Sequence, residues 1–211
     1  MTEAERMSKT SFPRGMFMLL ALLPLLHGCV AVVVGGAAVG AGVAHDRREA
    51  STVVDDRKLQ LTVLDHINQN KDLVRGNYRI KVVAYDGVLL LCGQAASEEL
   101  KSRAQSIAEA VEGSKRIVNE IEVVDEPEGF WRRREDNALS ARVKAALLDI
   151  TSMPGFDPTR INVTTSHQVV YLMGLVTHEE ADAAVDVARD VGGVEKVVKV
   201  FEYTDASGAQ G

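Results

Sequence analysis

The chain has 211 residues, of which 46% are hydrophobic and 26% are charged, which leaves room for one ordinary domain or two small ones. Its 24 Lys and Arg are outnumbered by 30 Asp and Glu, so the formal net charge is −6. This acidic balance argues against general nucleic-acid binding, because contacts with phosphates need clustered Lys and Arg. Any binding to an anionic surface must therefore come from a local basic patch.

Residues 1–28 have the three parts of an export signal. Lys9 and Arg14 supply a basic start, residues 15–26 form an apolar run too short to span a bilayer comfortably, and Gly28 is a small residue at the end. Removing this segment leaves 21 Lys and Arg against 28 Asp and Glu, a net charge of −7. We therefore expect an exported and acidic mature protein.

The residues around Cys29 indicate a lipid anchor. The sequence Leu26-His27-Gly28-Cys29 resembles the lipobox of bacterial lipoproteins, in which the signal is cut before the cysteine, and the cysteine is then acylated on its thiol and its new amine. Each buried methylene contributes about 0.8 kcal/mol to membrane binding, so more than one chain anchors a protein stably. The alternative is an ordinary signal peptide or a short membrane anchor, with Cys29 incidental.

The start of translation and the segment after the anchor are less sharply defined. Met1 and Met7 both remain open as the start. Residues 30–44 are apolar but small and rich in glycine, and they are shorter than the roughly 20 residues that a spanning helix needs. We expect residues 29–55 to be a lipidated N-terminus and flexible spacer, with a polar linker at 45–54.

From Asp56 onward the sequence repeats itself at an offset of about 80 residues. Each copy opens with apolar residues at helical spacing and continues with two strands that form a hairpin, turning at residues 85–87 or 166–168. A second helix follows, capped by Ser97 or Thr177 and ended by a glycine, and then a last strand. The apolar residues of the first helix that coincide are Leu59, Val63 and Ile67 in one copy and Leu139, Val143 and Leu147 in the other.

This pattern predicts an α+β fold with two tandem domains, residues 56–124 and 136–203. Each domain is expected to run α-β-β-α-β, with its helices packed on one face of a three-stranded mixed sheet. Residues 125–135 read as a charged connector, and residues 204–211 read as a disordered tail. Cys92 lies in an apolar run, so we expect it to be a buried strand residue.

The repeat resembles the BON domain, a module of exported bacterial proteins. The matching features are the hairpin that ends at Gly93 or Gly174, the amphipathic helix after it, and a Gly-x-x-x-hydrophobic-hydrophobic-x element that starts at Gly113 or Gly193. Two such units behind a lipobox resemble the dual-BON lipoproteins of the outer membrane. The resemblance implies a non-enzymatic periplasmic protein that binds phospholipid and supports outer-membrane integrity. It also implies sorting to the outer membrane, because Val30 stands where aspartate would mark inner-membrane retention.

Catalytic and metal-binding motifs are missing from the sequence. His178 and Glu179 lack the second histidine of the metalloprotease pattern, and no Gly-x-Ser-x-Gly, P-loop or Gly-x-Gly-x-x-Gly motif occurs. The histidines, which stand at positions 27, 45, 66, 167 and 178, do not form a spaced ligand set. We therefore expect no enzymatic activity, no cofactor and no metal.

One short segment has the composition of a membrane contact. Aromatic rings favour the bilayer interface, and each basic residue near an anionic surface adds about 1 kcal/mol. The candidate lipid-binding residues are Phe130, Trp131, Arg132, Arg133, Arg134, Arg142 and Lys144. The alternative is a solvated connector in which Trp131 packs between the domains and the arginines pair with the surrounding carboxylates.

Two functions therefore remain open. The first is a tethered module that binds anionic phospholipid. The second is a protein-interaction module that assists outer-membrane protein assembly or other envelope machinery through sheet edges or helix faces.

Overall fold

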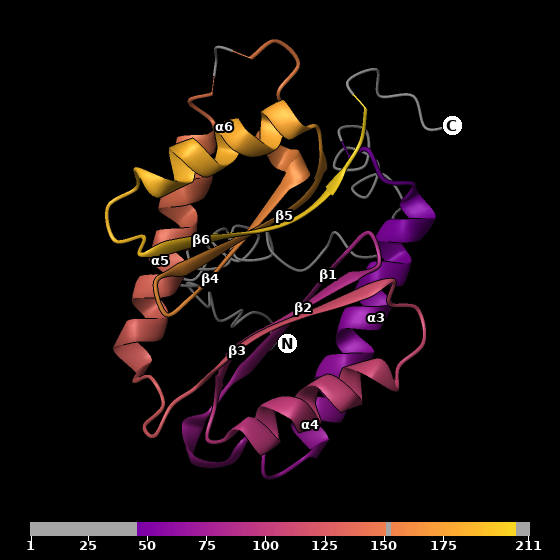
Figure 1. Ribbon diagram of the computed structural model, residues 1–211, viewed down its shortest axis with the longest axis vertical. Coiled ribbons are helices and arrows are strands. Elements are labelled where there is room, and N and C mark those ends of the chain that lie inside the picture. The colour runs from indigo at the N-terminus through magenta and orange to yellow at the C-terminus, as the bar shows by residue number, and fades with distance from the viewer. Residues whose placement is uncertain (1–45, 151–152, 206–211) are drawn as a thin grey trace, which may run out of the picture. The chain divides into compact units, whose positions relative to one another are not determined.

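The structure is a computed structural model that describes residues 46–150 and 153–205 (Figure 1). All of these residues belong to one compact unit, Val43–Gly211. The predictions on the export signal, the Cys29 anchor and most of the spacer concern residues outside the described part of the chain. The same holds for residues 206–211 of the tail.

The first repeat runs helix, strand, strand, helix, strand, as predicted. Its elements are α3 (Ala50–Gln69), η2 (Arg75–Asn77), β1 (Ile80–Tyr85), β2 (Val88–Ala95), α4 (Glu98–Glu109) and β3 (Arg116–Val123). Strand β2 pairs antiparallel with β1 and parallel with β3, so the sheet order is β1-β2-β3. Figure 1 shows α3 and α4 on the same side of this sheet.

The second repeat has the same architecture. Its elements are α5 (Phe130–Leu147), η3 (Pro158–Arg160), β4 (Ile161–Ser166), β5 (Val169–Val176), α6 (His178–Arg189) and β6 (Lys196–Tyr203). Strand β5 pairs antiparallel with β4 and parallel with β6, in the order β4-β5-β6. The predicted α+β class, with two mixed three-stranded sheets, is confirmed.

Each repeat has its own hydrophobic core between its helices and its sheet. In the first repeat, Leu59 and Val63 of α3 pack with Leu89 and Leu91 of β2. In the second, the core includes Leu139, Val143 and Leu147 of α5, Val170 and Leu172 of β5, and Ala181 and Ala184 of α6. Because strand side chains alternate between faces, these contacts use only one face of each sheet.

The other faces of the two sheets pack against each other in a third core. Val88, Leu90 and Cys92 of β2 lie there with Tyr171 and Met173 of β5. Strand β2 is therefore buried on both faces, and all eight of its residues are buried. Cys92 is fully buried in this strand, which confirms its predicted place.

Hydrogen bonds also join the two repeats across this third core. The ammonium of Lys81 donates to the carbonyl of Thr165 at 2.5 Å, and the hydroxyl of Tyr85 donates to the carbonyl of Arg160 at 3.1 Å. Such bonds satisfy polar groups that burial would otherwise leave unpaired.

The turns and caps follow the predicted local chemistry. Asp86 and His167 open the two hairpin turns with φ of 49° and 52°, which are left-handed values typical of tight hairpin turns. Ser97 caps α4 by accepting a hydrogen bond from the backbone N–H of Leu100. Thr177 and Glu180 form a reciprocal capping box at the start of α6.

The structure differs from expectation just before each repeat. Helix α5 begins at Phe130, so residues 130–135, expected in the connector, form its first turns. Helix α3 begins at Ala50, inside the segment expected to be linker. The apolar residues that face a core come later in each helix, so the helical spacing of core residues does not reveal these starts.

The residues that precede α3 pack against the two repeats and do not form a free linker. The guanidinium of Arg48 lies 3.6 Å from the centroid of the Tyr85 ring and 2.7 Å from a carboxylate oxygen of Asp56. The guanidinium of Arg47 reaches Glu180 of α6 at 2.5 Å. Charged residues thus tie this segment to both repeats.

Candidate functional site

Helix α5 starts with two exposed aromatic side chains. Gly129 precedes the helix, and Phe130 and Trp131 are 59% and 73% exposed. Their rings meet edge to face, with centroids 5.5 Å apart. The exposure of Trp131 contradicts the alternative in which this ring packs between the domains. Two adjacent exposed rings make this end of the helix a candidate interaction site.

The three arginines that follow make different contacts. Arg132 forms an ion pair with Glu135 at 3.3 Å and donates to the side-chain oxygen of Gln168 at 2.7 Å. Arg133 donates to the backbone carbonyl of Glu128. The guanidinium of Arg134 lies 5.8 Å from the centroid of the Phe130 ring. Arg132 thus pairs with a carboxylate, as the solvated-connector alternative expected, whereas the contacts of Arg133 and Arg134 are with a carbonyl and a ring.

All seven predicted residues lie on α5, and each of them is exposed or partly exposed. The buried side of the helix carries Asp136, Leu139, Val143 and Leu147. At 100° per residue, the opposite side carries Phe130, Arg134, Ala138, Ala141 and Ala145. Arg142 and Lys144 are exposed on its flanks.

The charge balance of helix α5 is positive. Five of the seven predicted residues are basic, whereas α5 carries two carboxylates, Glu135 and Asp136. Asp136 is buried, with 1% of its surface exposed, so Glu135 is the carboxylate that the helix presents to solvent. A local basic patch therefore exists on a chain that is acidic overall.

The family of the two repeats follows from a comparison with known proteins. The BON domain family matches residues 55–125 and 135–205. The chain belongs to the BON-domain family. The aromatic and basic cluster at residues 130–134 lies just before the second matched segment, and the equivalent positions before the first segment carry Ala50, Ser51 and Thr52.

Three relatives show the extent of the similarity. The chain is 35% identical to Outer membrane lipoprotein DolP of Haemophilus influenzae over 187 residues, which cover 89% of this chain and 94% of that protein. It is 36% identical to the 21 kDa hemolysin of Actinobacillus pleuropneumoniae over 75% of this chain and 79% of that protein. It is 40% identical to Osmotically-inducible protein Y of Escherichia coli over 34% of this chain and 35% of that protein.

Sequence reasoning missed a polar cluster that lies beside the start of α5. The imidazole Nδ1 of His167 is 3.0 Å from the carboxylate of Glu128 and 3.5 Å from that of Glu122. Burial raises the pKa of Glu128, and the nearby charge of Asp136 raises it further. His167 lies in a hairpin turn of the second BON domain, Glu122 in β3 and Glu128 in the chain after β3, so their spacing in the sequence holds no signal for the cluster.

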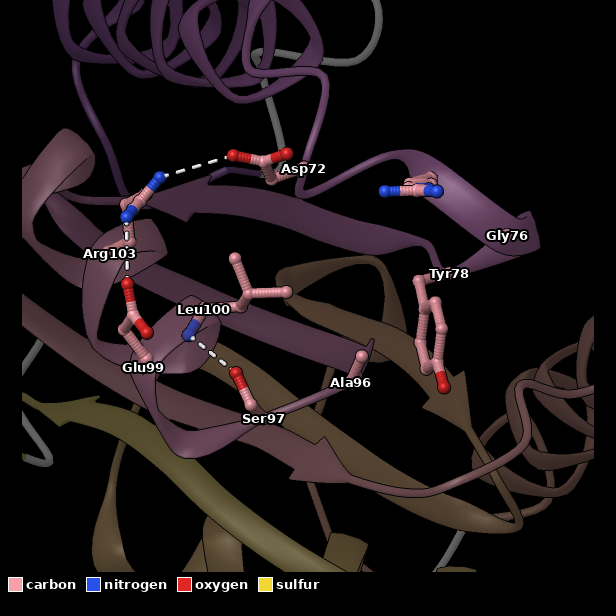
Figure 2. Close-up of a pocket in the computed structure, with 9 residues that line it drawn as sticks. Asp72, Gly76, Tyr78, Ala96, Ser97, Glu99, Leu100 and Arg103 are labelled. Carbon is pink, nitrogen blue, oxygen red and sulfur yellow. Dashed lines mark hydrogen bonds and ion pairs between the residues drawn. The ribbon is translucent and has the colours of Figure 1, made fainter.

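A pocket of about 480 Å³ in the first BON domain was also not predicted (Figure 2). Figure 2 shows Arg103 bridging Asp72 and Glu99, with N–O distances of 3.4 and 2.9 Å, while Tyr78 lies opposite. The positive charge of Arg103 is thus already met by two carboxylates. This pocket therefore has no excess of one charge with which to select an ion.

The described residues contain neither a cluster of metal ligands nor a membrane-spanning helix. Within residues 46–150 and 153–205, no group of three or more His, Cys, Asp and Glu side chains could hold a metal ion. None of the helices in this part of the chain is both long enough and apolar enough to cross a membrane.

Proposed function

We propose that this protein is a non-enzymatic lipoprotein of the outer membrane that binds anionic phospholipid through α5 of its second BON domain. The observation that carries the proposal is the exposure of Phe130 and Trp131 beside a run of three arginines on one helix. In this proposal, Cys29 holds the acyl anchor, the protein faces the periplasm, and its binding supports outer-membrane integrity.

The physical basis is the match between α5 and a bilayer interface. Aromatic rings settle at the level of the headgroups, and guanidinium groups attract anionic lipids with about 1 kcal/mol per residue. An acyl anchor adds to this contact by keeping the helix near the surface, since two weak membrane signals together give stable attachment. Glu135 reduces the attraction only locally, because its side chain is 67% exposed and screened by solvent.

The similarity to known proteins supports the location in this proposal. The relative from Haemophilus influenzae bears the name Outer membrane lipoprotein DolP and aligns over 94% of its length. The lipobox-like sequence before Cys29 and the Val30 that follows it agree with an outer-membrane lipoprotein. We also propose that the signal and the spacer precede two domains, of which the first runs from α3 to β3 and the second from α5 to β6.

The test is the flotation of the mature chain with Cys29→Ser, which removes the acylation site. We expect it to float with phosphatidylglycerol vesicles at low salt and less at physiological salt, and not with phosphatidylcholine vesicles. Replacing both Phe130 and Trp131 by Ser should abolish this flotation. Equal flotation with both lipids, or no flotation with either, would refute the proposal that α5 binds anionic phospholipid selectively.

Exposed apolar residues on α3 favour a second candidate function. Val54 and Leu61 are 63% and 48% exposed and stand seven residues apart, so they lie on one side of the helix. A protein-interaction module that assists outer-membrane protein assembly or other envelope machinery would use such a surface. This candidate predicts that a defined envelope protein binds the wild-type chain in detergent and that Val54→Ser with Leu61→Ser abolishes the binding.

A further inference from the structure

The two BON domains build the same pocket twice. In the first domain it has a volume of about 590 Å³, and in the second about 330 Å³. Both pockets lie beside the first helix of their domain, and their lining residues correspond at the offset of the repeat. The corresponding pairs are Asp56 and Asp136, Leu59 and Leu139, and Gly113 and Gly193.

Two lining positions differ between the pockets in an informative way. Thr52 and Thr62 line the first pocket, and Arg132 and Arg142 stand at the corresponding positions of the second. Because the first domain forms the same fold with threonine at both positions, the fold does not require the two arginines. The first pocket also holds Lys58 and Lys115, but the ammonium of Lys115 is already paired with Asp86 at 3.2 Å.

The two guanidinium groups of the second pocket are held from separate sides. The hairpin residue Gln168 accepts a hydrogen bond from Arg132 at 2.7 Å. The backbone carbonyl of Gly192 accepts one from Arg142 at 3.0 Å. Arg132 also pairs with Glu135 at 3.3 Å through the same Nη1 that donates to Gln168. These contacts use one nitrogen of each guanidinium group, which carries five N–H donors in all.

The carboxylates of this pocket do not cancel the arginines. Asp136 accepts hydrogen bonds from the backbone N–H groups of His167 and Gln168, at 2.9 and 3.0 Å, so its oxygens are already engaged. Glu135 pairs with Arg132 at 3.3 Å, but both side chains are largely exposed, so solvent weakens this pair. Ala138 and Leu139 supply an apolar part of the lining.

The position of the pocket relates it to the proposed membrane contact. Trp131, Glu135, Ala138 and Arg142 follow one another at helical spacing of i, i+4, i+7 and i+11, so they share one side of α5. Three of them line the pocket, and the fourth is the exposed indole. A lipid that contacts the indole of Trp131 would therefore lie on the same side of α5 as this pocket.

We propose that this pocket binds the phosphodiester headgroup of an anionic lipid, with Arg132 and Arg142 as its cationic contacts. This inference rests on the proposed function, which it makes specific. Guanidinium groups offer a planar fork that fits phosphate oxygens in pairs, as an ammonium group does not. A volume of about 330 Å³ has room for a headgroup.

The experiment compares three double variants in the mature Cys29→Ser chain. Arg132→Thr with Arg142→Thr installs the residues of the first pocket. Arg132→Lys with Arg142→Lys keeps the charge but removes both forks. Arg57→Thr with Lys71→Thr removes the same charge from exposed positions outside α5. The first measurement is binding to vesicles of phosphatidylcholine with and without phosphatidylglycerol.

We expect the threonine pair to lose roughly 30-fold or more in affinity for vesicles with phosphatidylglycerol, given the contribution of each basic residue near such a surface. The lysine pair should lose about tenfold, and the control pair less than threefold. Wild-type affinity in the lysine pair would overturn the pocket while leaving α5 as a lipid contact. No vesicle binding by the wild-type chain would overturn both.

A second measurement separates the lipid from a free anion. Glycerol phosphate or inorganic phosphate is titrated into the chain while the backbone amide signals of Gly192 and Gly193 are followed by NMR. Shifts of these signals that saturate and vanish in the threonine pair support the pocket. Such shifts without any binding to vesicles would assign the pocket to a free phosphate and overturn the proposal that it binds a lipid. The absence of any shift would also overturn the proposal.

Discussion

Asp56 and Asp136 hold the two hairpin turns of the protein by the same pair of hydrogen bonds. The carboxylate of Asp56 accepts from the backbone N–H groups of Asp86 and Gly87, both at 2.7 Å. The carboxylate of Asp136 does the same in the second repeat, and the two side chains are buried, with 5% and 1% exposed. Each first helix is thereby fixed to the hairpin that it covers.

The first prediction concerns this anchor. Asp136→Asn keeps the size of the side chain but turns one acceptor into a donor that faces a backbone N–H. Leaving such a buried group unpaired costs about 1–3 kcal/mol, so we expect this loss in the free energy of unfolding, measured with urea. The exposed neighbour Asn137 provides the control, and Asn137→Ala should stay within about 0.5 kcal/mol. Equal stability of the two variants would contradict the role of Asp136.

The second prediction ranks three glycines by the space around them. At Gly93, φ is 120° and an added Cβ would lie 2.2 Å from the carbonyl oxygen of Arg79. At Gly174 the Cβ would lie 2.7 Å from the carbonyl oxygen of Arg160, without a left-handed φ. At Gly113, φ is 108° but nothing lies within 4 Å.

Replacement by Ala should therefore be most damaging at Gly93, where backbone strain and a backbone clash add. Strain alone costs about 1–3 kcal/mol, which is the range we expect for Gly113→Ala. Gly93→Ala should exceed this value by at least 1 kcal/mol or prevent folding, because overpacking has a cost of its own. The measurement is the midpoint of urea unfolding, and a milder effect at Gly93 than at Gly113 would count against the clash.

The third prediction concerns the thiol of Cys92. Burial raises the pKa of this thiol to about 12, so almost no thiolate exists at neutral pH, and the group is also inaccessible. In the Cys29→Ser chain, a thiol reagent should therefore react with Cys92 only when the protein unfolds. Reaction in urea serves as the positive control. Rapid labelling of the folded chain at pH 7 would show that the core between the sheets opens.

The fourth prediction concerns the effect of low pH on the ion pair between Arg47 and Glu180. Burial alone would raise the pKa of Glu180, but hydrogen bonds from Arg47 and the Thr177 backbone, with the charges of Arg47 and Arg160, outweigh it and lower the pKa. A lowered pKa in the folded state means that this carboxylate stabilises the protein above about pH 4.3, its unfolded value. That stability is lost as the pH falls through the folded pKa.

We therefore expect Arg47→Ala to lower the melting temperature at pH 7 and to have a smaller effect at pH 3. Arg189→Ala provides the matched control, because Arg189 makes an exposed pair with Asp186 at 3.7 Å that should matter little at either pH. The same melting temperature for wild type and Arg47→Ala at pH 7 would show that Arg47 does not stabilise the fold.

The candidate site could be found from the sequence because its residues are close along the chain. Phe130 to Arg134 form one run on one helix, so composition alone revealed them. The sequence did not predict how these side chains are oriented. The exposure of Trp131 and the contact of Arg132 with Gln168 depend on where α5 lies against the hairpin. For the same reason, the pocket between Arg132 and Arg142 had no sequence signal.

By itself, the sequence determined the two repeats, the order of their elements, the caps of α4 and α6 and the burial of Cys92. These features depend on local periodicity and on short-range hydrogen bonds, which a run of residues encodes directly. Only the tertiary structure decided that the sheets pack face to face, that Arg47 and Arg48 bind both repeats, and that Asp56 and Asp136 hold the turns. Those contacts join residues far apart in the chain, and their partners are chosen by packing and not by sequence spacing.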